Sequence, residues 1–181
     1  MSTTPPIAGV LVRRLFEVSE SQARALAEVL IDCVEGGASV SFMHPLPLTK
    51  ALAFWQGVAD GVARGERALL VAEDRNGIVG TVQLVLDQPE NQPHRADVSK
   101  MLVHRRARRG GVGAALLRAV ELTARECGKS LLVLDTASDD AARLYARLGW
   151  TLCGAIPGYA LLPRGGLCDT HYFYRQLERS L

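Results

Sequence analysis

The sequence predicts a single α/β domain built on one mixed sheet. With 181 residues, of which 48% are hydrophobic and 22% charged, the chain is long enough for one sizeable core, and a second full domain is not expected. Its apolar residues alternate with a period of two in some segments and recur at helical spacing in others. In the C-terminal half a strand, a crossover helix and a second strand follow one another, which favours a sheet of mixed strand directions.

The N-terminal part begins with a short tail and a strand. Residues 1–6 are expected to form a flexible tail, and residues 7–181 are expected to form the single domain. The segment GVLVRRLF, residues 9–16, predicts the first strand. Ser19 or Ser21 can then cap the first helix, because a serine hydroxyl accepts a hydrogen bond from a free N–H group of the first turn.

A loop is expected between the first helix and the second. The first helix ends near Glu35, where two glycines follow. Two prolines and a mixture of polar and apolar residues make residues 38–50 a loop that could line a pocket. Thr49 is expected to cap a second helix that ends near Arg64.

Three strands and a tight turn are expected next. Residues 67–74 and 78–87 are apolar and rich in β-branched residues, and they flank Arg75-Asn76-Gly77. Asn-Gly tolerates the positive backbone dihedral angles of a tight turn, so these two strands are predicted to form a hairpin. A further strand is predicted over residues 96–104.

The rest of the chain is predicted to hold two helices and three strands. These elements are a helix over residues 111–127, a strand over 129–136, a helix over 139–148, a strand over 151–155 and, after a loop over 158–166, a strand over 167–177.

Charge and composition exclude several classes of protein. Lysine and arginine number 21 against 19 acidic residues, and a net charge of +2 lacks the broad basic excess of a nucleic-acid binder or a membrane-surface binder. The four cysteines and four histidines lack metal-binding spacing, so no metal is expected. The sequence shows neither a leader segment nor a membrane-spanning run, and we expect a cytoplasmic protein that binds no nucleic acid and no membrane.

The most informative stretch is RRARRGGVGAALL, residues 105–117, which joins a predicted strand to a predicted helix. Unpaired backbone N–H groups and the positive end of the helix dipole converge at such a junction, and glycines let a phosphate approach the main chain. The stretch predicts a site for a phosphate or pyrophosphate, with a solvated basic turn as the alternative.

Other phosphate-binding motifs fit this stretch less well. A dinucleotide fold would use Gly111, Gly113 and Asp135, but Leu116 stands in place of the third glycine. The GKS or GKT of a nucleotide-hydrolysing loop does not follow the glycines. The stretch also lacks the stacking aromatic residues that a nucleic-acid surface would need.

Two motifs occur together and in order. The pattern R-x-x-G-x-G stands at Arg108, Gly111 and Gly113, and SDDAARLYARLGW follows after a helix and a strand. With both motifs the chain resembles the GNAT superfamily of N-acetyltransferases over essentially the whole domain. Within the superfamily it is similar to the group that contains the tabtoxin resistance protein. The second motif is matched by Ala141, Leu144, Tyr145, Gly149 and Trp150.

The resemblance implies a fold and an acetyl donor. The fold would be a single domain with a mixed, mostly antiparallel central sheet and about four flanking helices, in which two central strands are parallel and splayed. Acetyl-CoA would bind in the splay, with its pyrophosphate in the glycine-rich cradle and its 3′-phosphate near Arg109 or Arg105. Ser138 stands where the family often has an asparagine. The donor-binding residues implied are Met101, Leu102, Val103, Arg108, Arg109, Gly110, Gly111, Val112, Gly113, Ala114 and Ser138.

The resemblance also implies catalytic roles. Tyr145 would protonate the departing thiolate, although its helical spacing also fits a core tyrosine. Asp97 and Asp135 would face the acceptor amine, hold its ammonium form and remove its proton directly or through water. The alternatives are a surface salt bridge for Asp97 and a capping or turn role for Asp135. Tyr159, in an expected loop, would form part of the acceptor wall.

These features predict an acetyl-CoA-dependent N-acetyltransferase that acts on a small amine, either amino-acid-like or a toxin. Two alternatives are acetylation of protein N-termini or lysines, and a non-catalytic module that binds acyl-CoA. The loops at residues 36–48 and 157–168 would select the amine, and the chain could form a homodimer.

Overall fold

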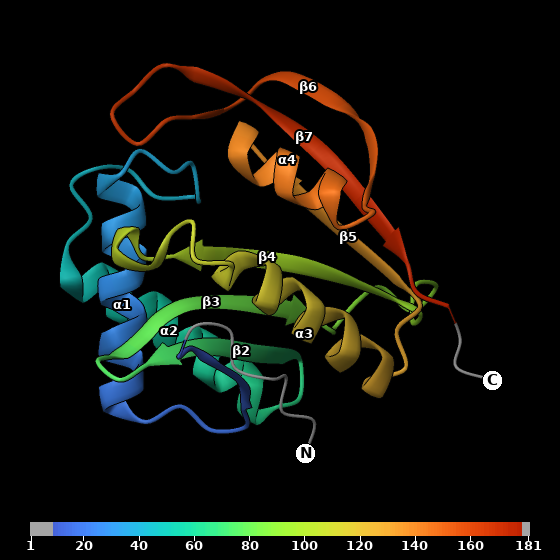
Figure 1. Ribbon diagram of the computed structural model, residues 1–181, viewed down its shortest axis with the longest axis horizontal. Coiled ribbons are helices and arrows are strands. Elements are labelled where there is room, and N and C mark those ends of the chain that lie inside the picture. The colour runs from blue at the N-terminus through green and yellow to red at the C-terminus, as the bar shows by residue number, and fades with distance from the viewer. Residues whose placement is uncertain (1–8, 179–181) are drawn as a thin grey trace.

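A computed structural model describes residues 9–178, so the tail expected over residues 1–6 lies outside the described residues. One seven-stranded sheet runs through the molecule in the order β1-β2-β3-β4-β5-β7-β6 (Figure 1). Every neighbouring pair is antiparallel except β4 and β5, which confirms the predicted mixed, mostly antiparallel sheet. The strands are β1 (Leu11–Leu15), β2 (Arg67–Asp74), β3 (Gly77–Val85), β4 (Arg95–Val103), β5 (Leu131–Thr136), β6 (Thr151–Leu161) and β7 (Leu167–Gln176).

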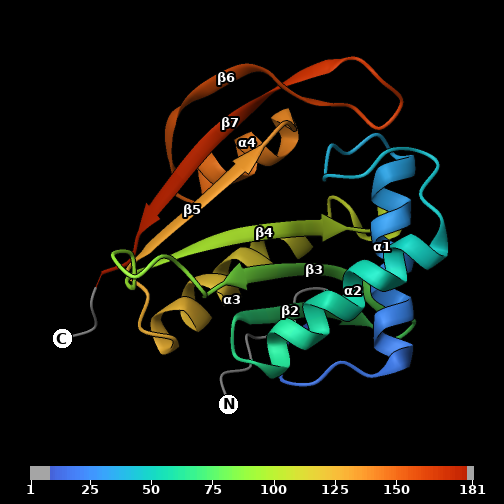
Figure 2. The ribbon, with the colours of Figure 1, turned by 180° about the vertical axis from the view of Figure 1, so that it is seen from behind.

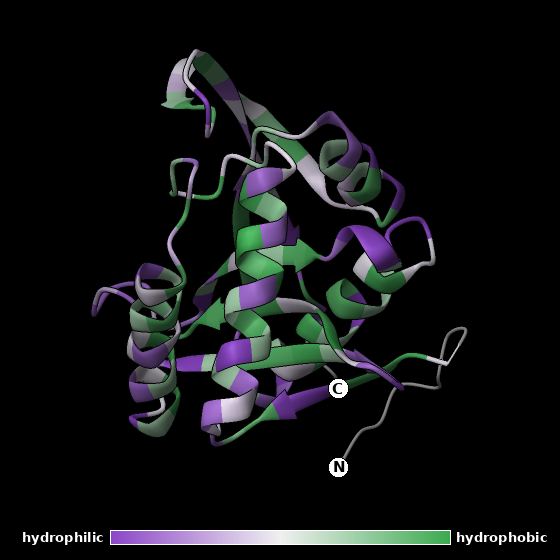
Figure 3. Ribbon diagram, turned by 90° about the vertical axis from the view of Figure 1, so that its left-hand side faces the viewer, coloured by the Kyte–Doolittle hydropathy of each residue, from purple (hydrophilic) through white to green (hydrophobic). Residues whose placement is uncertain are grey.

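Two pairs of helices cover the two faces of this sheet (Figures 1 and 2). The helices are α1 (Glu20–Glu35), α2 (Leu48–Ala63), α3 (Val112–Glu126) and α4 (Asp139–Arg147), with a short 3-10 helix η1 (Arg105–Ala107) before α3. On the face of α1 and α2 the core forms around the fully buried Trp55. On the face of α3 and α4 it forms around Leu116 and Leu117. Seen from the end, the strands between the helices are largely hydrophobic (Figure 3), as burial on both faces requires.

The local signals of the N-terminal half are confirmed. Ser19 caps α1 and forms a capping box with Gln22, in which each side chain accepts from the other residue's backbone N–H. Strands β2 and β3 form the expected hairpin, with Asp74 paired to Gly77. The Asp74 carboxylate accepts from the N–H of Asn76 at 2.8 Å and closes the turn.

Two boundaries differ from the sequence expectation. Helix α2 begins at Leu48 directly after Pro47, and Thr49 lies inside its first turn rather than capping it, because the proline ring fixes the backbone angle that starts the helix. Strand β6 continues to Leu161, through part of the loop expected over residues 158–166. Its register shifts between Ile156 and Ala160, so a bulge on this edge strand accommodates a proline and a glycine.

The central parallel pair separates soon after it begins. Strand β4 pairs with β5 only from Arg95 to Asp97, opposite residues 131–133. Beyond Asp97 the two strands diverge, as Figure 2 shows, while β4 remains paired with β3 as far as Val103. Backbone groups on the outer side of β4 are therefore left without a strand partner.

Candidate active site

A cavity of about 1260 Å³ occupies the space between the diverging strands. It continues to the junction of η1 and α3 and to the first turns of α4. Asp97 and Gly110 do not line it. The sequence-predicted residues that do are Met101, Leu102, Val103, Arg108, Arg109, Gly111, Val112, Gly113, Ala114, Asp135, Ser138, Tyr145 and Tyr159.

The start of α3 presents a cradle of free backbone N–H groups. Ala115 is the first residue to donate at this helix start, to the carbonyl of Gly111 at 3.0 Å. Among residues 9–178 the N–H groups of residues 109–114 have no acceptor. Gly111 is the N-cap, has φ +82° and offers no capping side chain. Since free N–H groups and the helix dipole favour an anion, this geometry fits a pyrophosphate.

Gly113 is also required by helix packing. A Cβ atom at this position would lie 3.0 Å from Cδ2 of Leu144 on α4. The glycine therefore lets α4, which carries Tyr145, pack closely against the start of α3.

Of the four arginines in this stretch, two are held by carboxylates outside the cavity. Arg105 pairs with the buried Asp32 through its backbone N–H and its side chain. Arg106 pairs with Asp74 at 2.5 Å. The structure thus leaves Arg109, which lines the cavity and makes no ion pair within the described chain, as the better placed of the two arginines expected near a 3′-phosphate.

The side chain of Arg108 extends from the cradle to the end of β4. Its Nε donates to the carbonyl of Val103 at 3.0 Å, and Cys33 donates to the same carbonyl through Sγ at 3.6 Å. Burial raises the pKa of Cys33, and the nearby Arg108 charge opposes this effect. The Cys33 thiol is therefore protonated and acts as a small packing group in the wall of the cavity.

Tyr145 lies in the core and at the cavity wall. Its ring packs against Trp150 and Phe173, with centroids 5.9 and 5.6 Å away. Burial, reinforced by the negative charge of Asp135, raises the pKa of Tyr145 far above its usual range. The phenol therefore keeps its proton and is in the neutral form that a general acid requires, so the core role and the catalytic role are compatible.

The two expected carboxylates lie near each other on β4 and β5, and both act on the pKa of Tyr172, but their partners differ. Asp135 lines the cavity and accepts from Oγ1 of Thr170 at 2.8 Å. Asp97 lies where β4 and β5 are still paired, and Arg95 and Gln88 occupy its carboxylate. The salt bridge given as the alternative for Asp97 is made with Arg95. Of these two carboxylates, Asp135 is the one that lines the cavity.

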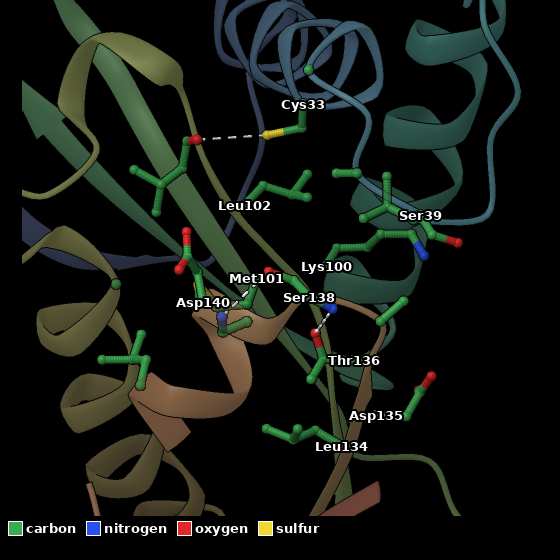
Figure 4. A pocket seen from close by; sticks show the side chains of 18 of the residues that line it. Cys33, Ser39, Lys100, Met101, Leu102, Leu134, Asp135, Thr136, Ser138 and Asp140 are labelled. Carbon is green, nitrogen blue, oxygen red and sulfur yellow. Dashed lines mark hydrogen bonds between the residues drawn. The ribbon is translucent and has the colours of Figure 1, made fainter. Parts of the chain in front are cut away.

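Ser138 acts as the N-cap of α4. Its hydroxyl accepts from the N–H of Ala141 at 3.3 Å, and its own N–H donates to Oγ1 of Thr136 at 3.1 Å. Figure 4 shows Ser138 and Thr136 beside Met101, across the splay. A pantetheine contact by Ser138 stays a prediction, because its oxygen already serves the helix.

Tyr159 reaches the cavity from β6, and its hydroxyl forms a hydrogen bond of 3.0 Å with that of Tyr172 on β7. This hydrogen bond, with burial and the charge of Asp135, raises the pKa of Tyr172 to about 12. The pair places two phenol hydroxyls near Asp135, and Tyr159 is the one that lines the cavity.

The loop after α1 is joined to the tip of the β6–β7 hairpin. Ser39 Oγ donates to the carbonyl of Leu161 at 3.1 Å, His44 N to that of Pro163 at 2.9 Å, and Arg164 to that of Glu35 at 2.9 Å. Figure 1 shows the two segments meeting above the splay. We call this connection the roof; it joins the two segments expected to select the amine.

Lys100 is a cavity residue that the sequence did not assign to the site. It has φ +50° where the register between β3 and β4 shifts. Its side chain lines the cavity and donates to Ser41 Oγ at 3.1 Å. Strand alternation alone does not predict such a bulge, so the sequence offered only an ordinary strand lysine.

Residues 9–178 contain no cluster of three or more histidine, cysteine, aspartate or glutamate side chains that could hold a metal ion. Over the same residues, every helix is too short or too polar to span a membrane.

Residues 65–152 match the family model of an acetyltransferase (GNAT) domain. The chain therefore contains a GNAT acetyltransferase domain. The matched residues run from β2 to the start of β6 and include the cradle, Asp135 and Tyr145. The protein is accordingly an acyltransferase.

Solved structures extend the GNAT fold beyond the matched segment. A ribosomal-protein-alanine N-acetyltransferase from Brucella melitensis is 25% identical, with a TM-score of 0.75, and the match covers 92% of this chain and 99% of that one. A phosphinothricin acetyltransferase from Sinorhizobium meliloti in complex with acetyl-CoA is 18% identical, with a TM-score of 0.76 and coverage of 93% and 89%. An N-acetyltransferase from Staphylococcus aureus is 15% identical, with a TM-score of 0.78 and coverage of 94% and 100%. The predicted single-domain GNAT fold is thus confirmed.

Proposed function

We propose that this acetyltransferase uses acetyl-CoA to acetylate the amine of a small molecule. The observation that carries the small-molecule assignment is the roof, which joins Ser39 to Leu161 and Arg164 to Glu35 over the acceptor end of the cavity. A protein tail would need an open groove at this end, whereas the roof favours a compact acceptor.

The donor fits the residues of the splay. The free N–H groups of residues 109–114 suit a pyrophosphate, and Arg109 supplies an unpaired guanidinium beside them. Along β4, residues 101–103 offer backbone groups without a strand partner, and one of these N–H groups can polarise a carbonyl as an oxyanion hole does. Acetyl-CoA supplies the acetyl group as an activated thioester.

Two side chains of the cavity would handle the protons. Asp135 would hold the ammonium form of the acceptor and accept its proton, directly or through water. Tyr145 would deliver a proton to the departing thiolate, since its raised pKa keeps the phenol neutral. Asp97, which is paired with Arg95 outside the cavity, would support the negative field around Asp135 rather than touch the acceptor.

Acetylation of a protein N-terminus is the second candidate. It is favoured by the similarity to the Brucella melitensis ribosomal-protein-alanine N-acetyltransferase.

The proposal of small-molecule acetylation includes three further points. We propose that the chain is related to the group of the tabtoxin resistance protein, that it is cytoplasmic and that it forms a homodimer. Edge strand β6 exposes Leu152, Ile156 and Leu161, which a second copy could cover.

Donor binding is tested with Gly111→Trp, which fills the cradle. We expect calorimetry to show acetyl-CoA binding to the wild-type protein and at least tenfold weaker binding to this variant, since the phosphate contacts would be lost. Gly128→Trp is the matched control, because Gly128 also has a positive φ of +71° but lies at the far end of α3 in open space.

The acceptor class is tested by release of free CoA thiol with a panel of small amines and of short peptides that end in alanine. Faster turnover of small amines supports the proposal. Peptides turned over faster than every small amine would establish the second candidate, and wild-type protein that binds no acetyl-CoA would contradict both.

A further inference from the structure

Lys100 is held in the cavity by an irregularity of β4. The register between β3 and β4 shifts between Thr81 and Gln83, opposite this part of the strand. Lys100 there adopts φ +50°, a left-handed conformation that residues with a side chain rarely adopt. An uncommon backbone conformation that points a polar side chain into a cavity is a reason to look for a function.

The ammonium group of Lys100 has neutral neighbours. Its Nζ donates to Ser41 Oγ at 3.1 Å and lies 5.8 Å from the ring centroid of Phe54. Within residues 9–178 no carboxylate approaches it to ion-pair distance. Burial lowers its pKa, and the charge of Asp135 partly opposes this effect. A partly buried cation without a paired anion is unfavourable, and an incoming anion would relieve it.

Two further charges act on Lys100, and their effects oppose each other. The charge of Arg67, on β2, lowers the pKa of Lys100. The Arg67 guanidinium donates to Oε1 of Gln83 at 3.0 Å. The charge of Asp135, on β5, raises the pKa of Lys100. The Asp135 carboxylate accepts a hydrogen bond from Thr170 Oγ1. Figure 4 shows Lys100 and Asp135 on the same side of the cavity, one from each diverging strand. This end of the cavity thus presents one cation and one anion.

We propose that Lys100 recognises an anionic group of the acceptor, a carboxylate or a related oxyanion, while Asp135 holds the acceptor's ammonium group. This inference rests on the proposed function, because it concerns the acceptor of the same site. It makes Lys100 a residue that determines specificity: among small amines, those that carry an anionic group near the amine are preferred over those that lack one.

The test compares the common amino acids with their carboxamides, which keep the side chain and the amine but lose the carboxylate. We expect the wild-type protein to have a higher kcat/KM for the acids that it acetylates than for their carboxamides. Lys100→Met should reduce this preference about ten- to hundredfold, mainly through KM for the acid, because a hydrogen bond between charged groups is lost. Lys100→Arg keeps the charge and should retain most of the preference.

Lys50→Met is the matched control. The Lys50 ammonium lies 5.9 Å from the ring centroid of Phe42, which packs against Phe54. The substitution therefore removes a cation from the same aromatic cluster but not from the cavity. This variant should keep the wild-type preference. Circular dichroism and calorimetric binding of acetyl-CoA verify that Lys100→Met is folded and holds the donor.

Each outcome decides between the inference and the proposed function. Three results would overturn the role of Lys100 and leave acetylation of a small amine intact. These are equal use of carboxamides and acids, use of amines without an anionic group in place of all amino acids, and an unchanged preference in Lys100→Met. Failure of the wild-type protein to bind acetyl-CoA would instead overturn the proposed function itself.

Discussion

At the scale of single residues, Tyr145 shows how one side chain can belong to the core and to the site. Its ring packs against Trp150 and Phe173, while the residue also lines the cavity. Tyr145→Phe keeps the packing and removes only the hydroxyl. We expect kcat to fall about a hundredfold or more, as loss of a general acid does, with the Kd for acetyl-CoA within about twofold of wild type. Tyr174→Phe on β7, outside the cavity, is the control.

Wild type and Tyr145→Phe also test the burial of the Tyr145 phenol through the pH dependence of unfolding. Because burial raises the pKa of Tyr145 above its ordinary value of 10.0, the folded state keeps the proton while the unfolded chain releases it. The contribution of the neutral phenol is therefore complete below pH 10.0 and decreases above it. Urea unfolding should show wild type losing about 1.4 kcal/mol per pH unit relative to Tyr145→Phe above that pH. Equal pH dependence in the two proteins would contradict the burial of the phenol, and an unchanged kcat would contradict its role as general acid.

At the scale of elements, the end of α1 anchors the cradle. Asp32, which is buried near the end of α1, accepts from the backbone N–H and the guanidinium of Arg105 at the start of η1. Asp32→Asn should lower the free energy of unfolding by about 2 kcal/mol, because a charge-assisted pair with a buried acceptor is lost. It should also weaken acetyl-CoA binding several-fold, since η1 leads directly into residues 109–114.

Glu73→Gln is the control for that anchor. Glu73 is more exposed than Asp32, with 24% of its side chain accessible against 9%, and its pair with Arg13, at 2.7 Å, lies on β1 and β2 away from the cavity, so the substitution should cost less than about 1 kcal/mol and leave donor binding unchanged. If Asp32→Asn matched Glu73→Gln in unfolding and in calorimetry, α1 would not be the anchor.

Elements whose signal is local could be predicted from the sequence. The Ser19 cap and the β2–β3 hairpin depend on a few adjacent residues and are confirmed. The R-x-x-G-x-G pattern located the cradle because free N–H groups at a helix start follow from chain geometry. The bulge at Lys100 and the full length of β6 depend on neighbouring strands, which the local sequence does not reveal.

At the scale of the whole molecule, two halves of the sheet line the cavity from opposite sides of the diverging strands. Strands β1 to β4 with α1 and α2 provide Lys100 and the β4 backbone, whereas β5 to β7 with α4 provide Asp135 and Tyr145. Asp97 was expected to complete a carboxylate pair, but it lies where the two halves are still joined by the sheet. The place at which a parallel pair stops pairing is a property of the whole sheet, so a sequence position on β4 could not fix it.

The roof also connects these halves, and we expect it to limit the size of the acceptor. The double substitution Ser39→Ala and Arg164→Ala removes two of its three hydrogen bonds, and the second of these places a guanidinium at the carbonyl end of α1, where the helix dipole favours a cation. Each bond contributes about 1 kcal/mol, so the equilibrium constant for closing the roof should fall about thirtyfold.

We expect this double variant to raise KM for the preferred small amine about five- to tenfold, while the Kd for acetyl-CoA stays within about twofold, because neither substituted side chain hydrogen-bonds to residues 109–114. Turnover of alanine-ended peptides should rise relative to the small amine, since an open end admits a longer chain. Arg118→Ala on the outer face of α3 is the control and should change neither value. Steady-state thiol-release assays with both acceptor types measure the effect. A double variant with wild-type KM and wild-type selectivity would mean that the loop and the hairpin tip do not confine the acceptor, and the size of the amine would then be set within the splay by Lys100, Asp135 and Tyr159.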